Sequence, residues 1–319
     1  MTNRRDEQPK ERRTFPHSDI IFDSNVIDPD DCRNESLLRL VEKLLASPRS
    51  GNVWFSLPSL YEVLAPKDAG RRIELLKRFQ NLYRQFGSRV RFIDFDLYSF
   101  VAAEWSGSGL RSAPASMIDD EVTASIAAGD LVGYLKTFRE TWIKERTRIH
   151  EEHAERTRYL CGHYEAEQWF RDEFKRNMDL YGTENALEQC DLLAKNIIVS
   201  HTKRPPDAIL TAKADHVAYP CTWTYALLAR LADYAATITK AERELNFARY
   251  DTLLTPDRND LVDAYVAASG GRCGSLVTHD GVLIERINFL HDAVPSLIHL
   301  QAFTVDDALR GFDPSEKHA

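Results

Sequence analysis

The chain of 319 residues is 43% apolar and 28% charged, a composition that indicates a folded globular protein and excludes a disordered or fibrous one. Its formal net charge of −8 excludes an overall cationic coat for nucleic acid but leaves room for a local basic track. There is no C-x-x-C pair, so neither a zinc ribbon nor a disulfide framework is indicated by the five scattered cysteines, Cys32, Cys161, Cys190, Cys221 and Cys273.

The N-terminal residues 1–17 are polar and mixed in charge, and we expect a disordered leader there. They contain no apolar stretch of the kind found in a signal peptide. The most apolar helical stretch, residues 225–238, is interrupted by Arg230 and Asp233 and is too short to span a bilayer. A cytoplasmic protein with no membrane partner is therefore expected.

The first third of the chain alternates between predicted strands and helices. Apolar runs predict strands at 20–23, 53–56 and 89–96. Apolar residues at helical spacing predict amphipathic helices over 35–47 and 69–87, and further helices are expected to begin at Pro58 and at residue 97. This alternation is typical of parallel βαβ units.

The alternation stops at residues 106–116, "SGSGLRSAPAS", which are small and flexible. Residues 117–254 are predicted to be almost entirely helical. A capped helix at 255–271, a strand at 274–280, and a last strand with a short helix within 295–312 then resume the alternation. We therefore predict an α/β fold with a doubly wound, mainly parallel central sheet, made of residues 18–105 and 255–319. The segment 106–254 is predicted to be a large all-α insertion.

Acidic residues stand where the predicted strands end. Asp23 closes the first strand, Glu62 lies in the first turns after the second, and Asp280 follows the strand that contains Thr278. Asp260 and Asp263 are three residues apart and share one face of the helix before that strand. In open α/β sheets, functional groups gather outside the carboxyl ends of the strands.

Converging carboxylates repel one another unless a cation compensates, and oxygen ligands without His or Cys favour Mg²⁺ or Mn²⁺. Such ions activate water and assist displacement at a phosphodiester. Each acid also has a simple structural interpretation: Asp23 as a cap, Glu62 as a surface charge, Asp260 as a favourable charge at a helix N-terminus and Asp280 as a turn residue. The shared position at one sheet edge favours the metal site.

Together these pieces resemble the PIN domain, a family of metal-dependent nucleases of the PIN/FEN-like class. The resemblance covers about residues 19–105 and 255–312. The matching motifs are "IIFDSNVI", "SLPSLYEVL", "DLVDAYVAA" and "SLVTHDGVLI", with "LIHLQAFTVDDAL" as the terminal strand and helix. The helical middle of the chain has no counterpart in the resemblance.

The resemblance implies roles for particular residues. The catalytic and metal-ligating acids would be Asp23, Glu62, Asp263 and Asp280. Asn25 would support Asp23 through a hydrogen bond, Asp260 would assist Asp263, and Thr278 would orient Asp280 or contact the scissile phosphate. The family further implies one or two Mg²⁺ or Mn²⁺ ions and endonucleolytic cleavage of RNA, mainly single-stranded.

Three other functions remain open. The same acids would cleave DNA in a structure-selective nuclease. A catalytically idle PIN-like scaffold could bind a protein partner through the helical segment, although it would have no need for repelling carboxylates. A toxin restrained by an antitoxin is a third possibility.

The helical segment offers weaker signals. Basic residues interleaved with aromatics would suit a single-stranded nucleic-acid track, but nearby glutamates nearly balance them. The candidates are Arg139, Lys144, Arg146, Arg148, Lys203 and Arg204. His150, His153, Cys161 and His163 invite a zinc interpretation, although their spacing matches no standard structural site. The aromatic-rich stretches are most simply packing faces, and they could equally bury a protein partner or a second copy of the chain.

Overall fold

A computed structural model describes residues 19–27, 34–46, 51–56, 69–86, 89–93, 130–179, 219–239 and 247–312, together with a few positions between them. Its centre is a five-stranded, all-parallel sheet. The strands are β1 (Ile20–Phe22), β2 (Val53–Ser56), β3 (Val90–Ile93), β4 (Ser275–Val277) and β5 (Gln301–Phe303). The expected α/β class with a parallel sheet is therefore confirmed.

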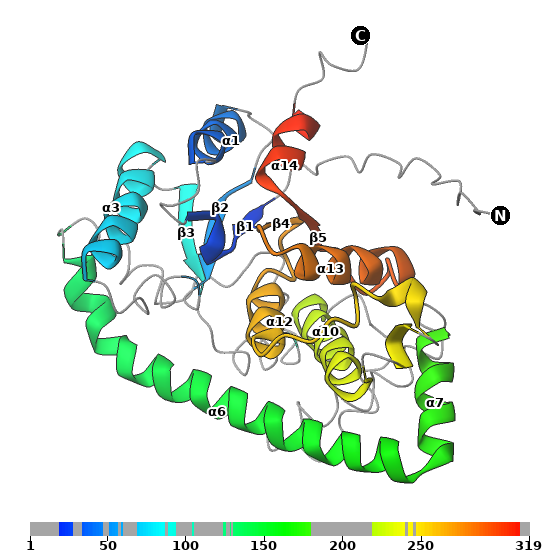
Figure 1. The fold of residues 1–319 in the computed structure, drawn as a ribbon. Helices are drawn as coiled ribbons and strands as arrows, with labels where there is room; N and C mark the ends of the chain where they lie inside the picture. The colour runs from blue at the N-terminus through cyan, green and yellow to red at the C-terminus, as the bar shows by residue number, and fades with distance from the viewer. Residues whose placement is uncertain are drawn as a thin grey trace, which may run out of the picture.

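The strand order is β3-β2-β1-β4-β5 (Figure 1). The chain moves outward from β1 to β3 in one direction, returns to the centre, and continues from β4 to β5 in the other direction. The order thus reverses between β1 and β4, where Phe22 pairs with Val277. In parallel α/β sheets, the crevice outside the strand ends at such a reversal is the usual place for a ligand.

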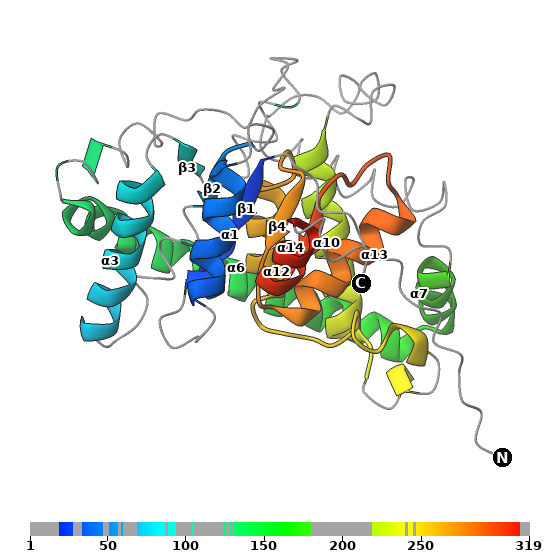
Figure 2. The ribbon, with the colours of Figure 1, turned by 90° about the horizontal axis from the view of Figure 1, so that it is seen from above.

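Helices lie on both sides of the sheet (Figure 1). One layer contains α1 (Asn34–Ala46), α3 (Ala69–Phe86) and α14 (Val305–Phe312), which follow one another in the view from above (Figure 2). The other layer contains α10 (Pro220–Thr237), α12 (Asp260–Ser269) and α13 (Gly281–Ala293). Burial from both sides explains why the strands are continuous apolar runs.

The two faces of the sheet carry different side chains. Phe22, Phe55 and Phe92 stand in register across three strands, with ring centroids 5.7 and 6.2 Å apart. The opposite face carries Ile21 and Trp54, which belong to one buried cluster with residues of α10, α12 and α13. Most of the buried aliphatic side chains of α10, α12 and α13 pack in this cluster, on the second face of the sheet.

The described part of the predicted all-helical segment is mostly helical. Helix α6 (Leu131–Ala166) has 36 residues and crosses the outside of α10 and α12, and α7 (Gln168–Asp179) follows it at an angle (Figure 1). A single turn of 3-10 helix, η1 (Ser24–Ile27), follows β1, and another, η5 (Ala248–Tyr250), precedes α12. Most residues of α10 are buried, and several of them, including Leu227 and Leu231, belong to the cluster that covers the sheet, so this helix belongs to the central core.

The domain boundaries at 18–105, 106–254 and 255–319 remain a prediction. The predicted leader, residues 1–17, lies outside the described residues. None of the helices in the described ranges is long and apolar enough to cross a membrane.

Candidate functional site at the carboxyl edge of the sheet

Asp23 and Thr278 meet at the reversal point of the sheet. Each follows the last residue of its strand, and the pairing of Phe22 with Val277 brings the two side by side. The Asp23 N–H donates to the Val277 carbonyl at 3.0 Å, and the Thr278 hydroxyl donates to Asp23 Oδ2 at 2.8 Å. Asp23 is 6% exposed and Thr278 is fully buried. The carboxylate therefore sits in a fixed orientation at the sheet edge.

The Thr278 hydroxyl connects this acid to two neighbours. It accepts hydrogen bonds from Asn25 Nδ2 and from the Asp280 backbone N–H, both at 3.0 Å. Asn25 Oδ1 in turn accepts from the His279 N–H at 2.9 Å. A hydroxyl has one proton and two lone pairs, so these bonds satisfy it completely. Thr278 therefore orients its neighbours and has no capacity left to bind a further group. Asn25 is linked to Asp23 indirectly, through the Thr278 hydroxyl.

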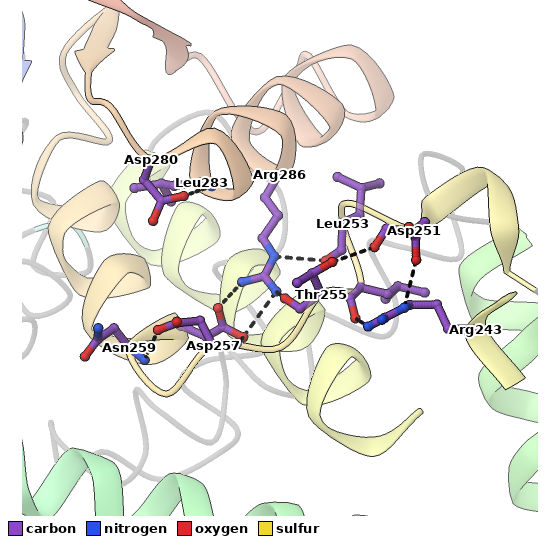
Figure 3. Close-up of polar contacts among 11 residues, drawn as sticks. Arg243, Asp251, Leu253, Thr255, Asp257, Asn259, Asp280, Leu283 and Arg286 are labelled. Carbon is purple, nitrogen blue, oxygen red and sulfur yellow. Dashed lines mark hydrogen bonds and ion pairs between the residues drawn. The ribbon is translucent and has the colours of Figure 1, made fainter. Parts of the chain in front are cut away.

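Asp280 caps helix α13. Its Oδ1 accepts a hydrogen bond from the Leu283 N–H at 2.9 Å, and its side chain is partly exposed (Figure 3). An ionised carboxylate offers about four acceptor positions over two oxygens, so capping leaves capacity for a cation. The cap fixes the Asp280 side chain at the start of α13, and the bond from its backbone N–H to Thr278 links its main chain to the residue that orients Asp23.

Asp260 is part of a buried ion pair. It is 3% exposed, and its two oxygens receive the Nη1 and Nη2 groups of Arg286. Oδ2 also accepts from the Asp257 N–H at 3.1 Å. Burial raises the pKa of Asp260, and the bonds from Arg286 oppose that shift. With its oxygens engaged in this way, Asp260 can assist the acids only by holding the start of α12 in place.

Arg286 extends the same network to the chain before α12. Its Nε donates to the Leu253 carbonyl and its Nη2 to the Thr255 carbonyl, both at 3.0 Å. Figure 3 shows the guanidinium reaching from α13 toward the turn that carries these two residues. The arginine thus joins α13, α12 and the turn before α12, and the sequence analysis did not single it out.

Asp263 lies one turn into α12 and is partly exposed, with its N–H bonded to the Asn259 carbonyl. Helix α12 ends beside the amino edge of the sheet, because Gly274, just after it, donates to the Asp19 carbonyl before β1. The start of the helix, which carries Asp260 and Asp263, therefore lies away from that amino edge.

Glu62 lies outside the described residues. Among the residues described, no three His, Cys, Asp or Glu side chains are close enough together to hold a metal ion. The four-acid metal site remains a prediction.

The candidate zinc residues all lie on α6, and each has a different neighbour. His153 is buried close to the Asp260 carboxylate, and burial lowers its pKa. Cys161 Sγ lies 3.7 Å from the Ala236 carbonyl, and His163 Nδ1 lies 2.9 Å from Glu167. His150 lies near Asn259, with its pKa also lowered by burial.

Two of the candidate nucleic-acid-binding residues are engaged within the protein. Arg146 donates to Asn259 Oδ1 at 3.1 Å and so fastens α6 to the start of α12. Arg148 pairs with Glu145 and Glu152 on the surface of α6. Lys144 is exposed. Arg139 is in α6, but its side chain lies outside the description, as do Lys203 and Arg204.

Glu104 is a buried acid that the sequence analysis did not identify. Its carboxylate accepts from the Cys221 N–H at 2.8 Å, and from the N–H and hydroxyl of Thr222 at 3.0 and 2.6 Å. Pro220, the first residue of α10, has no N–H, so Glu104 satisfies the next two donors of the helix. Burial raises its pKa against the effect of these bonds. Since 117 positions separate Glu104 from Cys221, no local pattern could reveal the cap.

Comparisons with known proteins identify no relative: no family model matches the chain, and neither does a curated protein or a solved structure.

Proposed function

We propose that this protein is a metal-dependent phosphodiesterase of PIN-like type, an endonuclease that hydrolyses RNA, mainly where it is single-stranded. The observation that carries the proposal is the Thr278 hydroxyl, which donates to the Asp23 carboxylate at the end of β1 and accepts from the backbone N–H of Asp280 beyond the end of β4. These are the two strands between which the sheet order reverses. A buried acid and a capping acid tied together at that point make a good candidate ligand site.

The donors at this point fit a hard divalent cation. Asp23 and Asp280 both offer carboxylate oxygens, the ligand type that favours Mg²⁺ or Mn²⁺ over Zn²⁺. Asp263 and Glu62 are the proposed further ligands. When bound, such an ion lowers the pKa of a coordinated water and stabilises the charge that develops at the phosphodiester.

The residues around the acids would control their orientation. Thr278 and Asn25 hold the Asp23 carboxylate at the sheet edge, and the α13 cap holds Asp280. The Asp260–Arg286 pair fixes the start of α12, and with it the position of Asp263. Preorganisation of this kind is a general requirement for catalysis, because misplaced groups lose much of their effect. The preference for RNA over DNA rests on the resemblance to PIN domains.

Cleavage assays with a matched pair of variants test the proposal. Labelled single-stranded RNA, single-stranded DNA and a flapped duplex would each be incubated with Mn²⁺, Mg²⁺ or EDTA. We expect metal-dependent cutting of RNA, reduced about 100-fold or more in Asp23→Asn, since a metal-assisted step loses several kcal/mol with its ligand. Asp19→Asn is the control, because Asp19 lies before the same strand at the opposite edge and bonds Asn52 and Trp54.

Circular dichroism would establish that both variants fold. A folded wild-type protein that neither cuts any of the substrates nor binds Mn²⁺ in calorimetry contradicts the proposal. Equal cutting by wild type and Asp23→Asn would also contradict it, because the acid would then have no part in the reaction.

A further inference from the structure

A small pocket opens between α6, α7 and α10, separate from the acids at the sheet edge. Its volume is about 200 Å³, below the roughly 300–1,000 Å³ of pockets that take drug-sized ligands. Leu160, Phe170 and Tyr234 supply apolar surface, and charged side chains from all three helices complete the lining. The size suits one flat ring system better than a larger ligand.

Asp233 lines this pocket, and one of its carboxylate oxygens is an unsatisfied hydrogen-bond acceptor. The residue is 3% exposed, and its Oδ2 pairs with Arg156 Nη2 at 2.7 Å. Its Oδ1 is buried and has no hydrogen-bond partner among the residues that the structure describes. Burial raises the pKa of Asp233 to about 6, so the group is still ionised at pH 7 to 8. A buried, charged oxygen without a donor is costly, and a ligand N–H would satisfy it.

Trp169 provides an exposed aromatic surface at the same pocket. Its side chain is 60% exposed, which is unusual for the largest apolar residue type. The Trp169 ring contacts the Phe170 ring edge to face, with centroids 5.7 Å apart. The Phe170 ring contacts His163 at 5.9 Å, and His163 contacts the exposed Tyr159 at 4.4 Å, so the four rings form a row. Exposed aromatic rings arranged in this way can stack on nucleic-acid bases.

The charges in the pocket balance one another and give no net attraction for an anionic ligand. The Arg156 charge is matched by Asp233, and the Arg230 guanidinium lies over the Tyr234 ring, with Nε bonded to the Tyr234 hydroxyl at 2.9 Å. Glu173 adds an exposed carboxylate to the lining. A neutral ring with an N–H donor fits this set better than a phosphate does.

We propose that the pocket binds a nucleobase that carries an exocyclic amino group, with the amino N–H donated to Asp233 Oδ1 and the ring stacked on Trp169. Adenine, cytosine and guanine have such a group. Uracil has instead an N–H between two carbonyl oxygens, which the carboxylate repels. If the base belongs to an RNA strand, the inference rests on the proposed function and describes how that strand is held outside the cleavage site.

Binding measured in EDTA tests this inference independently of cleavage. Fluorescence anisotropy of labelled short oligo(A), oligo(C) and oligo(U) would be followed with the full chain. We expect oligo(A) and oligo(C) to bind more tightly than oligo(U). Trp169→Ala should weaken their binding about fivefold or more, while Trp169→Phe retains most of it. Ile143→Ala is the control, because Ile143 is an exposed apolar residue of α6, 47% exposed, that does not line the pocket.

A second variant tests the hydrogen bond. Asp233→Asn can present an amide N–H to the carbonyls of uracil. We therefore expect this variant to bind oligo(U) with an affinity closer to its affinities for oligo(A) and oligo(C). Unchanged binding in Trp169→Ala, or a base preference that Asp233→Asn leaves intact, would overturn the inference. So would the absence of binding by any oligomer and by adenosine.

Competition with adenosine identifies the source of the base. If adenosine displaces oligo(A) at low concentration, or binds in a Trp169-dependent manner by itself, the pocket takes free nucleosides. If only the oligomer binds, the base belongs to a strand. Because Asp23→Asn should leave all of these results unchanged, failure of the pocket inference and failure of the nuclease proposal can be told apart.

Discussion

At the scale of single residues, the buried acids differ in how their charge is balanced. Asp260 receives two donors of Arg286, which is itself buried. The Asp233 carboxylate is paired with Arg156, whose side chain is 40% exposed. The pKa of Asp233 is accordingly raised to about 6 from its ordinary value of 3.8, with burial as the main cause. Titration of this carboxyl group should therefore make the free energy of unfolding depend on pH.

The sign follows from proton binding. Because the folded state holds the Asp233 proton more tightly than the unfolded state, its contribution to stability is complete below about pH 4 and is lost as pH rises through 6. The loss is about 3 kcal/mol for a shift of about two units. Asp233→Asn removes this titrating group, so the variant should not lose this free energy of unfolding as pH rises. We therefore expect the stability of the variant, relative to that of the wild type, to rise by about 3 kcal/mol between pH 4 and pH 7.

Urea unfolding at a series of pH values would measure this difference. Comparison of variant with wild type is needed because Arg156, Arg230 and Glu173 also face the pocket and other groups titrate elsewhere. Asp251→Asn, whose carboxylate is 63% exposed in its pair with Arg243, controls for the loss of one negative charge. If the free energies of unfolding of Asp233→Asn and wild type changed in parallel with pH, the raised pKa of Asp233 would be contradicted.

At the scale of elements, the Asp260–Arg286 pair fastens α12 to α13. Arg286 also bonds the carbonyls of Leu253 and Thr255, so a single side chain holds three segments. Removal of one member leaves the other as an uncompensated buried charge. We expect Arg286→Met to lower the free energy of unfolding by about 3–5 kcal/mol, measured by urea denaturation at pH 7.

Two further variants make this prediction specific. Asp260→Leu combined with Arg286→Met removes both charges and should recover much of the loss, because paired hydrophobic replacements of buried ion pairs are often tolerated. Arg310→Met breaks an exposed pair with Asp307 and should cost no more than about 1 kcal/mol. Equal costs for Arg310→Met and Arg286→Met would show that burial of the pair does not determine its contribution.

The elements also show what the sequence could reveal. The strands were predictable because each is a short apolar run, and the positions of Asp23 and Thr278 follow from where those runs end. The Glu104 cap of α10 joins residues that are far apart in the chain, and nothing near either one signals the other. Even the pairing of Asp260 with Arg286, 26 positions apart, depends on how α12 and α13 pack rather than on local spacing.

At the scale of the whole molecule, α10 joins the helical segment to the sheet. Several of its buried side chains belong to the same cluster as Ile21 and Trp54, although α10 comes from the segment predicted to be an insertion. Its first turn lies against Gly271, where an added Cβ would meet the Cys221 backbone at 2.8 Å. Packing this close makes independent movement of α10 costly, since a well-packed core has little free volume.

Native-state hydrogen exchange of the full chain tests whether α10 and the sheet unfold together. We expect the slowest amides of α10, such as those of Leu227 and Leu231, to exchange with the same free energy and the same urea dependence as those of β1 and β4, because one shared core opens as a unit. Helix α7, with Trp169 exposed, provides the internal control and should exchange through smaller openings. If α10 instead opened at a much lower free energy than the strands, the helical segment would be a separate folding unit and the shared core would contribute little to its stability.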